Sequence, residues 1–271
     1  MNRPATRQIT SAANSLLKLY RRALKDGATR DGWLAIEGPH LVEEALRPGS
    51  RGVVRSVLVT AHAAAKRPDL LARLPCEAEV TQISAAIFRQ VSQTEATQEV
   101  AALVELAPPS LDSLLALPDA LLLVAAGVQD PGNLGTMLRS AHAFGATALF
   151  ALRQTVSPFN PKAVRASAGA IFHLPVAASL EARALLSRLR ENGIRIAAAE
   201  RASHKALTEA DLRGRLAILI GREGSGLDPE LLRVADARLS IPIRPASDSL
   251  NASAAAAIFL YEARRQRGFS Y

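Results

Sequence analysis

The sequence has very little cysteine, few aromatic residues and no long apolar run. The single cysteine, Cys76, cannot form an internal disulfide or supply a cysteine-based zinc site. Three Tyr and one Trp are too few for a platform on which single-stranded bases would stack. The longest unbroken apolar run, residues 120–128, is about half of the ~20 residues that cross a bilayer. We therefore predict no disulfide, no metal centre and no membrane span.

The N-terminal segment, residues 1–11, contains no hydrophobic core of the kind that a secretory signal requires. This absence favours a cytoplasmic protein. The chain has 271 residues, of which 49% are hydrophobic and 21% are charged. These values are typical of a soluble globular protein, and the length leaves room for two domains.

Positive charge is in excess, with a formal net charge of +8. A basic surface attracts polyanions such as nucleic acids, because binding releases condensed counterions. Residues 1–30 are especially basic, with Asp26 as their one acidic residue. Their cations are Arg3, Arg7, Lys18, Arg21, Arg22, Lys25 and Arg30. The excess indicates an RNA or DNA partner, although a solvated helix face would give the same local pattern.

The common nucleotide and hydrolase motifs are missing. The segment GREGSG (221–226) does not have the GxGxxG spacing of a dinucleotide site, and no GxxxxGK[ST] phosphate loop or GxSxG elbow occurs. Histidine is scattered without the spacing of metal ligands. The five positions are His40, His62, His142, His173 and His204. Hydride transfer, phosphoryl transfer and zinc hydrolysis are therefore not supported.

Apolar runs that alternate with amphipathic segments predict two α/β halves. We expect a first domain over residues 1–107, a proline-punctuated linker over 108–118 and a second domain over 119–271. Alternating strands and helices predict a parallel sheet with helices on both faces. The second half has five main expected strands, with a short further one near residue 176. They cover residues 120–128, 147–152, 194–200, 215–221 and 238–243. Ligands of such sheets bind at the carboxyl ends of the strands.

Three segments of the second half carry a family resemblance. They read DPGNLGTMLRSAHAFGA from residue 130, LIGREGSGL from residue 219, and IPI followed by SLNASAAAA from residue 241. In this order and spacing they resemble the three motifs of the SpoU/TrmH family of ribose 2′-O-methyltransferases, in the SPOUT superfamily. The intervening segment 159–176 also matches. The segment WLAIEGPHLVEEAL (33–46) resembles the family's substrate-binding domain, which has a ribosomal-protein-like α/β fold.

The resemblance implies a deep trefoil knot in the C-terminal domain, with S-adenosyl-L-methionine bent in the knotted loops. The adenine would be held mainly by backbone groups, and glycine permits the close approach that this needs. The cofactor-binding residues that the resemblance implies are Ile220, Gly221, Gly226, Ile241, Ile243, Ser249 and Leu250. No metal is implied.

The resemblance also implies four catalytic residues, which are Asn133, Arg139, Glu223 and Asn251. A ribose 2′-hydroxyl is a weak acid that must lose its proton as it attacks the methyl carbon. A guanidinium is almost always protonated, so we expect Arg139 to position and stabilise charge, although relay of the proton stays open. Asn133 would orient the substrate or Arg139, and Glu223 would accept hydrogen bonds or pair with Arg139. Asn251 can also cap the last helix.

The implied activity is methyl transfer to a ribose 2′-hydroxyl in structured RNA. Ribosomal RNA is favoured over tRNA because an N-terminal RNA-binding module is typical of the branches that act on ribosomal RNA. Two alternatives stay open: a tRNA 2′-O-methyltransferase, and a non-catalytic RNA-binding or assembly factor that keeps the fold. A base methyltransferase of another SPOUT branch is less favoured, since its motifs are missing. A homodimer is implied, with an apolar face over residues 254–261 suited to the contact.

Overall fold

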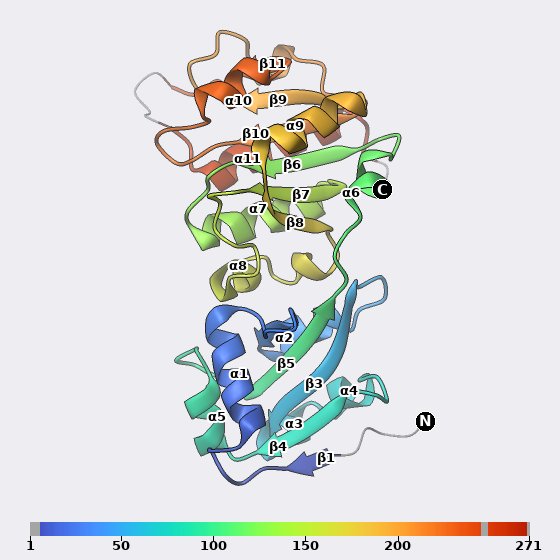
Figure 1. Cartoon of the computed structure of the whole chain (residues 1–271), viewed down its shortest axis with the longest axis vertical. Helices are drawn as coiled ribbons and strands as arrows, with labels where there is room; N and C mark the ends of the chain where they lie inside the picture. Colours follow the sequence, from blue (N-terminus) through green and yellow to red (C-terminus); the bar gives the residue numbers. More distant parts are fainter. Residues whose placement is uncertain (1–5, 245–248, 270–271) are drawn as a thin grey trace. The chain divides into compact units, whose positions relative to one another are not determined.

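The computed structural model of the chain describes residues 6–244 and 249–269. Figure 1 follows the course of the chain through two compact units. The first comprises residues 1–107 together with 159–173, and the second comprises 108–158 together with 174–271. The segment 159–173, which sequence reasoning places in the second domain, thus makes its contacts with the first unit.

The first unit is built on a five-stranded mixed sheet in the order β1-β4-β3-β5-β2. β1, β4 and β3 run parallel, whereas β5 is antiparallel to both β3 and β2. The strands are β1 (Thr6–Gln8), β2 (Leu34–Glu37), β3 (Gly52–Thr60), β4 (Glu79–Ile83) and β5 (Val100–Leu106). The helices are α1 (Ser15–Asp26), α2 (Pro39–Ala45), α3 (Ala61–Lys66), α4 (Pro68–Ala72) and α5 (Ala85–Val91), with α8 (Pro161–Ala166) and the 3-10 turn η1 (Ala170–Phe172) from the later segment.

Helix α1 shows how the sequence sets these elements. Asn14 caps its first turn by accepting from the backbone N–H of Leu16 at 2.9 Å. The helix ends at Gly27, whose φ of +96° is a left-handed conformation that glycine adopts readily. Tyr20 is fully buried, and its hydroxyl donates to Ser56 Oγ at 2.9 Å. Burial raises the pKa of Tyr20 above its ordinary range, so the phenol stays neutral.

A buried carboxylate joins the segment 159–173 to the first unit. Glu44 on α2 is 6% exposed and accepts from Arg47 at 2.8 Å. Its second oxygen lies 3.1 Å from His173 Nε2. Gly169, at a φ of +91°, leaves the space that the Glu44 side chain fills, since a Cβ there would come within 2.4 Å of it. A buried charge with polar partners and a glycine shaped to it explains why this segment packs here.

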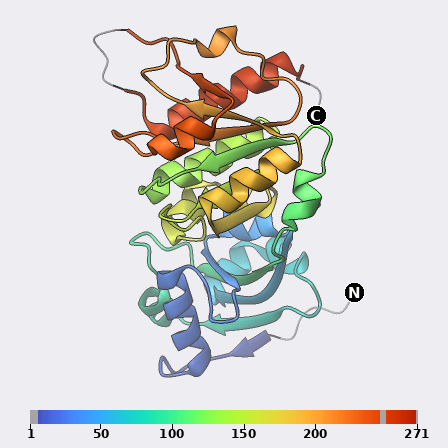
Figure 2. The same ribbon diagram turned by 45° about the horizontal axis from the view of Figure 1, so that its top comes forward.

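The second unit is an α/β layer around a six-stranded parallel sheet in the order β11-β9-β10-β6-β7-β8. Figure 2 shows the sheet and its helices from a second direction. The strands are β6 (Leu121–Ala125), β7 (Ala148–Leu152), β8 (Val176–Leu180), β9 (Arg195–Ala199), β10 (Leu216–Ile220) and β11 (Ala237–Leu239). β11 is shorter than the strand predicted over 238–243, which leaves Ile241 and Ile243 outside the sheet.

Helices cover both faces of this sheet. The further elements are α6 (Leu111–Leu115), α7 (Pro131–Ala143), α9 (Ala182–Glu191), the 3-10 turn η2 (Leu207–Glu209), α10 (Pro229–Val234) and α11 (Ala252–Gln266). Leu122 and Val124 of β6 share one core with α6, α9 and α10. The alternating residues Leu121 and Leu123 are equally buried and belong to the opposite face, where α7 and α11 pack together. Complete burial explains the continuous apolar run of β6.

Over residues 6–244 and 249–269, no helix is both long and apolar enough to cross a membrane. Within the same ranges, no cluster of three or more His, Cys, Asp or Glu side chains has the arrangement of a metal site. Cys76 is exposed and free.

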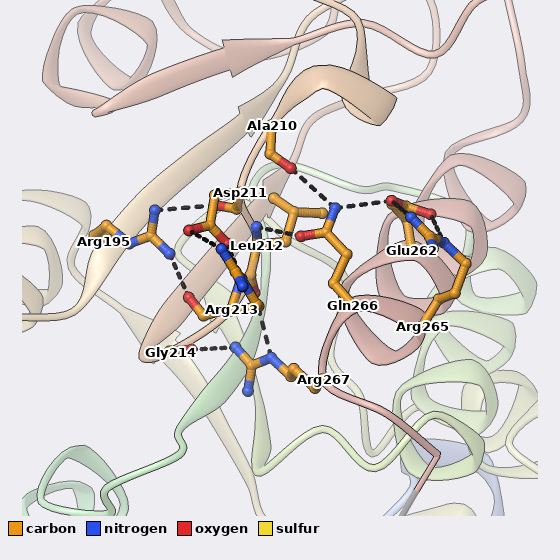
Figure 3. A network of polar contacts seen from close by, with 10 residues as sticks. All are labelled: Arg195, Ala210, Asp211, Leu212, Arg213, Gly214, Glu262, Arg265, Gln266 and Arg267. Carbon is orange, nitrogen blue, oxygen red and sulfur yellow. Dashed lines mark hydrogen bonds and ion pairs between the residues drawn. The ribbon is translucent and has the colours of Figure 1, made fainter.

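A polar network fastens the end of α11 to the loop that precedes β10 (Figure 3). Gln266 Nε2 donates to the carbonyl of Ala210 at 2.9 Å, and Gln266 Oε1 accepts from the N–H of Leu212 at 2.8 Å. The Arg267 guanidinium donates to the carbonyls of Asp119 at 3.0 Å and Leu212 at 3.3 Å, and also to that of Gly214. Burial lowers the pKa of Arg267. These contacts fix α11, whose other end carries one of the predicted site motifs.

Replacing Arg267 with alanine is expected to destabilise the second unit by about 2 kcal/mol, because a charged donor that satisfies several carbonyls is lost. Arg233→Ala is the matched control in the same unit. The Arg233 side chain is 69% exposed and lies 3.7 Å from Glu230, which is 84% exposed, and such exposed pairs contribute less than about 1 kcal/mol. Urea denaturation of both variants measures the difference, and equal midpoints would contradict the assigned role of Arg267.

Candidate functional site

A pocket of about 330 Å³ lies where β9, β10 and β11 end. Its wall includes all seven residues that the sequence predicts for cofactor binding: Ile220, Gly221, Gly226, Ile241, Ile243, Ser249 and Leu250. The carboxyl edge of a parallel sheet is where ligands of this architecture bind. Segments far apart in the sequence thus meet around one cavity, and the role of each residue toward a cofactor stays a prediction.

The turn after β10 depends on glycine. A Cβ on Gly221 would lie 2.3 Å from the backbone carbon of Gly226, which is closer than real atoms approach. The two segments pair through the N–H of Arg222 to the carbonyl of Gly226 at 2.9 Å, with the reciprocal bond at 3.0 Å. Gly226 adopts a φ of +70°. We name residues 221–226 the glycine loop; it projects Glu223 away from the sheet, with its side chain exposed.

Helix α7 carries the first predicted motif into the site. Asp130 caps the helix by accepting from the N–H of Asn133 at 2.7 Å, and Pro131 occupies the first helical position. These signals start the helix at a defined residue and place Asn133 in its first turn. Leu134, Met137 and Leu138 anchor the buried face of α7, which leaves the Asn133 side chain partly exposed.

Three predicted catalytic residues form one chain of hydrogen bonds. Asn251 Nδ2 donates to Asn133 Oδ1 at 2.9 Å, and Asn133 Nδ2 donates to a carboxylate oxygen of Glu223. Asn251 Oδ1 caps α11 by accepting from the N–H of Ser253 at 2.8 Å and from its hydroxyl at 2.6 Å. The cap directs the Asn251 oxygen toward the helix, so its amide donors face Asn133. We name Asn251, Asn133 and Glu223 the amide–carboxylate chain.

The structure does not bring Arg139 into the amide–carboxylate chain. Arg139 lies on the exposed side of α7, and it makes no hydrogen bond or ion pair with any residue in 6–244 or 249–269. Glu223 therefore accepts from Asn133 and does not pair with Arg139, which was one of its two predicted roles. Residues 133 and 139 are six positions apart, or about 240° around a helix with 3.6 residues per turn. That rotation places their side chains on different faces.

Sequence reasoning missed several residues around the pocket. Glu200 and Arg201 follow β9 directly and line the cavity beside the glycine loop. Phe259 of α11 closes it with a buried ring. The rule that ligands bind at strand ends could have indicated both residues, since Glu200 is the last residue of the strand predicted over 194–200 and Arg201 follows it. No local signal marks Phe259, because its position depends on how α11 packs.

Two family models match the chain. The SpoU rRNA Methylase family matches residues 120–261, and an MRM3-like substrate binding domain matches residues 16–102. Together they cover the core of both units. The first match contains Asn133 and Glu223 as well as Asn251, so it includes the whole amide–carboxylate chain.

Individual proteins agree with these models. The 23S rRNA (guanosine(2553)-2′-O)-methyltransferase RlmP of Bacillus subtilis is 34% identical over 95% of this chain and 99% of its own. An AdoMet-bound rRNA methyltransferase from Sinorhizobium meliloti has a TM-score of 0.82 and 28% identity, covering 96% of this chain and 98% of its own. The AdoMet complex of the SpoU methyltransferase AviRb from Streptomyces viridochromogenes has a TM-score of 0.81 and 26% identity over 94% and 98% of the two chains. All three matches extend over nearly the full length of the chain, and we conclude that the chain belongs to the SpoU rRNA methylase family.

Proposed function

We propose that this protein transfers a methyl group from S-adenosylmethionine to a ribose 2′-hydroxyl in ribosomal RNA. The observation that carries the proposal is the amide–carboxylate chain, which joins all three sequence motifs at the rim of one pocket. The printed activity of the Bacillus subtilis relative supports ribosomal RNA as the substrate, and the two AdoMet-bound structures support the cofactor.

The pocket at the ends of β9, β10 and β11 fits this cofactor. Ile241, Leu250 and Phe259 supply apolar surface suited to a purine ring. Glu200 and Glu223 contribute carboxylates, which favour the positive charges of the sulfonium and the α-amino group. The contact between Gly221 and Gly226 keeps backbone polar groups at the cavity wall free of side-chain bulk. When bound, the cofactor supplies a methyl group on a positively charged sulfur.

The amide–carboxylate chain prepares the site for a hydroxyl. Each amide is oriented by its neighbour, so the Glu223 carboxylate is held by Asn133, and it forms no ion pair within residues 6–244 and 249–269. Held this way, it is an acceptor for a polar hydrogen of the ribose or of the cofactor. Preorganised polar groups lower the barrier because they need not reorient during the reaction. The side chains of Glu223 and Asn251 are exposed, which leaves them accessible to an RNA strand.

Arg139 has a different role in this proposal. Its unpaired, exposed guanidinium suits a phosphate next to the reacting ribose, where it stabilises developing negative charge. We also propose a homodimer through α7 and α11, which would bring Arg139 toward the pocket of the second subunit. Support comes from exposed apolar side chains on α11, where Ile258 is 38% and Tyr261 47% exposed. Phe144 and Phe269 each lie 5.9 Å from the Tyr261 ring, centroid to centroid.

Further features of the family are proposed for this chain. They are a trefoil knot in the domain over residues 119–271, an N-terminal RNA-binding domain over 1–107 with a ribosomal-protein-like fold, a linker over 108–118 and a cytoplasmic location. The match of residues 16–102 to a substrate binding domain supports the second of these. The basic residues before position 30 support it too, because phosphates attract cations without requiring a sequence.

Asn133→Ala is expected to lower methylation about 100-fold, because the chain loses its central residue and Glu223 loses its donor. The assay incubates the protein with methyl-labelled S-adenosylmethionine and an unmodified 23S rRNA transcript, and then maps 2′-O-methylated ribose. Thr136→Ala is the control, since Thr136 is exposed on the same helix and its hydroxyl donates to the carbonyl of Gly132, one turn earlier. Wild-type incorporation by Asn133→Ala would contradict the assigned site. Label on tRNA alone, or on no RNA, would overturn the proposed activity.

Gly221→Ala is expected to weaken S-adenosylmethionine binding at least tenfold, because the added Cβ must push the glycine loop open. Gly193→Ala, in the turn between α9 and β9 and outside the pocket lining, is the control. Its φ of +64° gives alanine a local strain of about 1 kcal/mol, but its Cβ would meet nothing within 4 Å. Isothermal titration calorimetry with the cofactor compares the two variants. Equal affinity for both would show that the contact with Gly226 does not shape the cofactor pocket.

A further inference from the structure

A second, larger pocket lies on the other side of the glycine loop. It has a volume of about 550 Å³ and is lined by the carboxyl ends of β6, β7 and β8 together with the loop that leads into α10. Arg222 and Gly226 line both pockets, so the glycine loop is the wall between them. The volume falls within the range typical of small-molecule and nucleotide sites. None of the four predicted catalytic residues lines it.

The topology favours a ligand at this position. The chain runs outward from β6 through β7 to β8, and then crosses to β9 on the other side, with β10 inserted next to β6. The connections that follow β6 and β10 therefore diverge at this point of the sheet. Such a switch in strand order opens a crevice at the carboxyl ends of the strands, which is the general ligand position of open α/β sheets.

Three carboxylates line this pocket beside its two guanidiniums, and each has a partner of its own. Glu181 caps α9 by accepting from the N–H of Ala184 at 2.7 Å and of Arg183 at 3.1 Å, and these bonds lower the pKa of its carboxyl. Asp228 caps α10 by accepting from the N–H of Glu230 at 2.8 Å, and the Glu230 carboxylate lies 3.7 Å from Arg233.

Arg153 is exposed and makes no hydrogen bond or ion pair with the other described residues, although its charge contributes to the lowered pKa of Glu181. Its N–H donors are therefore available to an anion at the rim of the pocket.

Arg222 supplies a second, positioned cation. Its guanidinium donates to the side-chain oxygen of Gln154, a partner that carries no charge. Gly127 makes room for this side chain, because a Cβ there would lie 2.5 Å from Arg222 Nε. Gln129 donates to the carbonyl of Gly127 at 3.0 Å and also to that of Gln154. The Arg222 side chain thus lies across the ends of β6 and β7, in contact with Gly127 and Gln154.

The rest of the lining suits a base. Apolar atoms come from Ala126, Leu152, Ala182, Leu227 and Leu231. The Gln154 amide keeps its N–H donors for another partner, since only its oxygen is used by Arg222. Two guanidiniums, an amide and an apolar floor together match a phosphate attached to a nucleobase better than a free inorganic ion.

We propose that this pocket binds a nucleotide of the RNA substrate that neighbours the methylated one, with Arg153 and Arg222 on its phosphate. The inference rests on the proposed function, because it assumes that RNA reaches the glycine loop from this side. The glycine loop then lies between the cofactor and the neighbouring nucleotide. The ribose that is methylated meets the cofactor at the tip of the loop, beside Glu223, and the neighbouring nucleotide lies behind Arg222. Contacts to the phosphate fix the register of the RNA strand in the site, and they do not select the identity of the base.

Binding of an unmodified 23S rRNA transcript, measured by filter retention over a series of salt concentrations, tests the proposal. Arg153→Ala is expected to weaken binding about tenfold and to reduce the slope of log K against log salt by about 0.7, the value for one phosphate on a single strand. Arg213→Ala removes the same charge from the same unit, at the loop before β10, and should change both quantities much less. Arg213 is 69% exposed and pairs with Asp211 at 2.9 Å.

Ala182→Trp fills the pocket without changing a charge. It is expected to weaken RNA binding by a similar factor while leaving the salt slope and the calorimetric affinity for S-adenosylmethionine unchanged. Circular dichroism establishes that each variant is folded. Equal effects of Arg153→Ala and Arg213→Ala, or full RNA affinity in Ala182→Trp, would overturn the proposal. Loss of cofactor affinity in Ala182→Trp would assign the pocket to the cofactor and overturn it as well. These measurements report RNA binding and not methylation. A wild-type protein that binds the transcript but does not methylate it would therefore contradict the proposed function and leave this test of the pocket valid.

Discussion

The approach of Gly221 to the backbone of Gly226 is the constraint on which the site depends. It folds six residues into a loop so narrow that one wall can serve two cavities, each lined in part by Arg222 and Gly226. The same turn carries Glu223 to the end of the Asn133 side chain. A side chain at position 221 would separate the two halves of the loop and remove the carboxylate from its donor.

Helix capping orients the polar side chains of the site. Asn251 begins α11 and Asp130 begins α7, and each uses a side-chain oxygen for the cap. The capping bonds fix the Asn251 side-chain oxygen toward α11, so the amide nitrogen of Asn251 donates to Asn133. Because the Asn133 oxygen accepts this bond, the Asn133 amide nitrogen is directed toward Glu223. N-capping bonds stabilise the first turn of any helix. Here the same bonds also orient the amide–carboxylate chain at the exposed rim of the pocket. The polar anchor at the far end of α11, through Gln266 and Arg267, keeps this helix in place.

Much of this arrangement is readable from the sequence, although not all of it. The apolar runs predict the parallel sheet because β6 and β10 are buried on both faces, and the three motifs predict the family, which the family model confirms. The motifs also predict residues that now surround one pocket. β4 is difficult to read from the sequence because Glu79 and Gln82 interrupt its apolar pattern. Its pairing with β3 and β1 overrides that weak local signal. Arg153 and Gln154 form no motif, so only the strand order places them beside Arg222.

In the proposed arrangement, the glycine loop lies between a cofactor pocket and a pocket for a neighbouring nucleotide of the RNA. A crystal structure of the protein with S-adenosylhomocysteine is the sharpest test, since this product of methyl transfer contains the adenosine and the amino-acid part of the cofactor. We expect difference density among Gly221, Leu250 and Phe259, and none in the second pocket beside Arg153. Density beside Arg153 instead, or no density at either side of the glycine loop at saturating ligand, would contradict this arrangement.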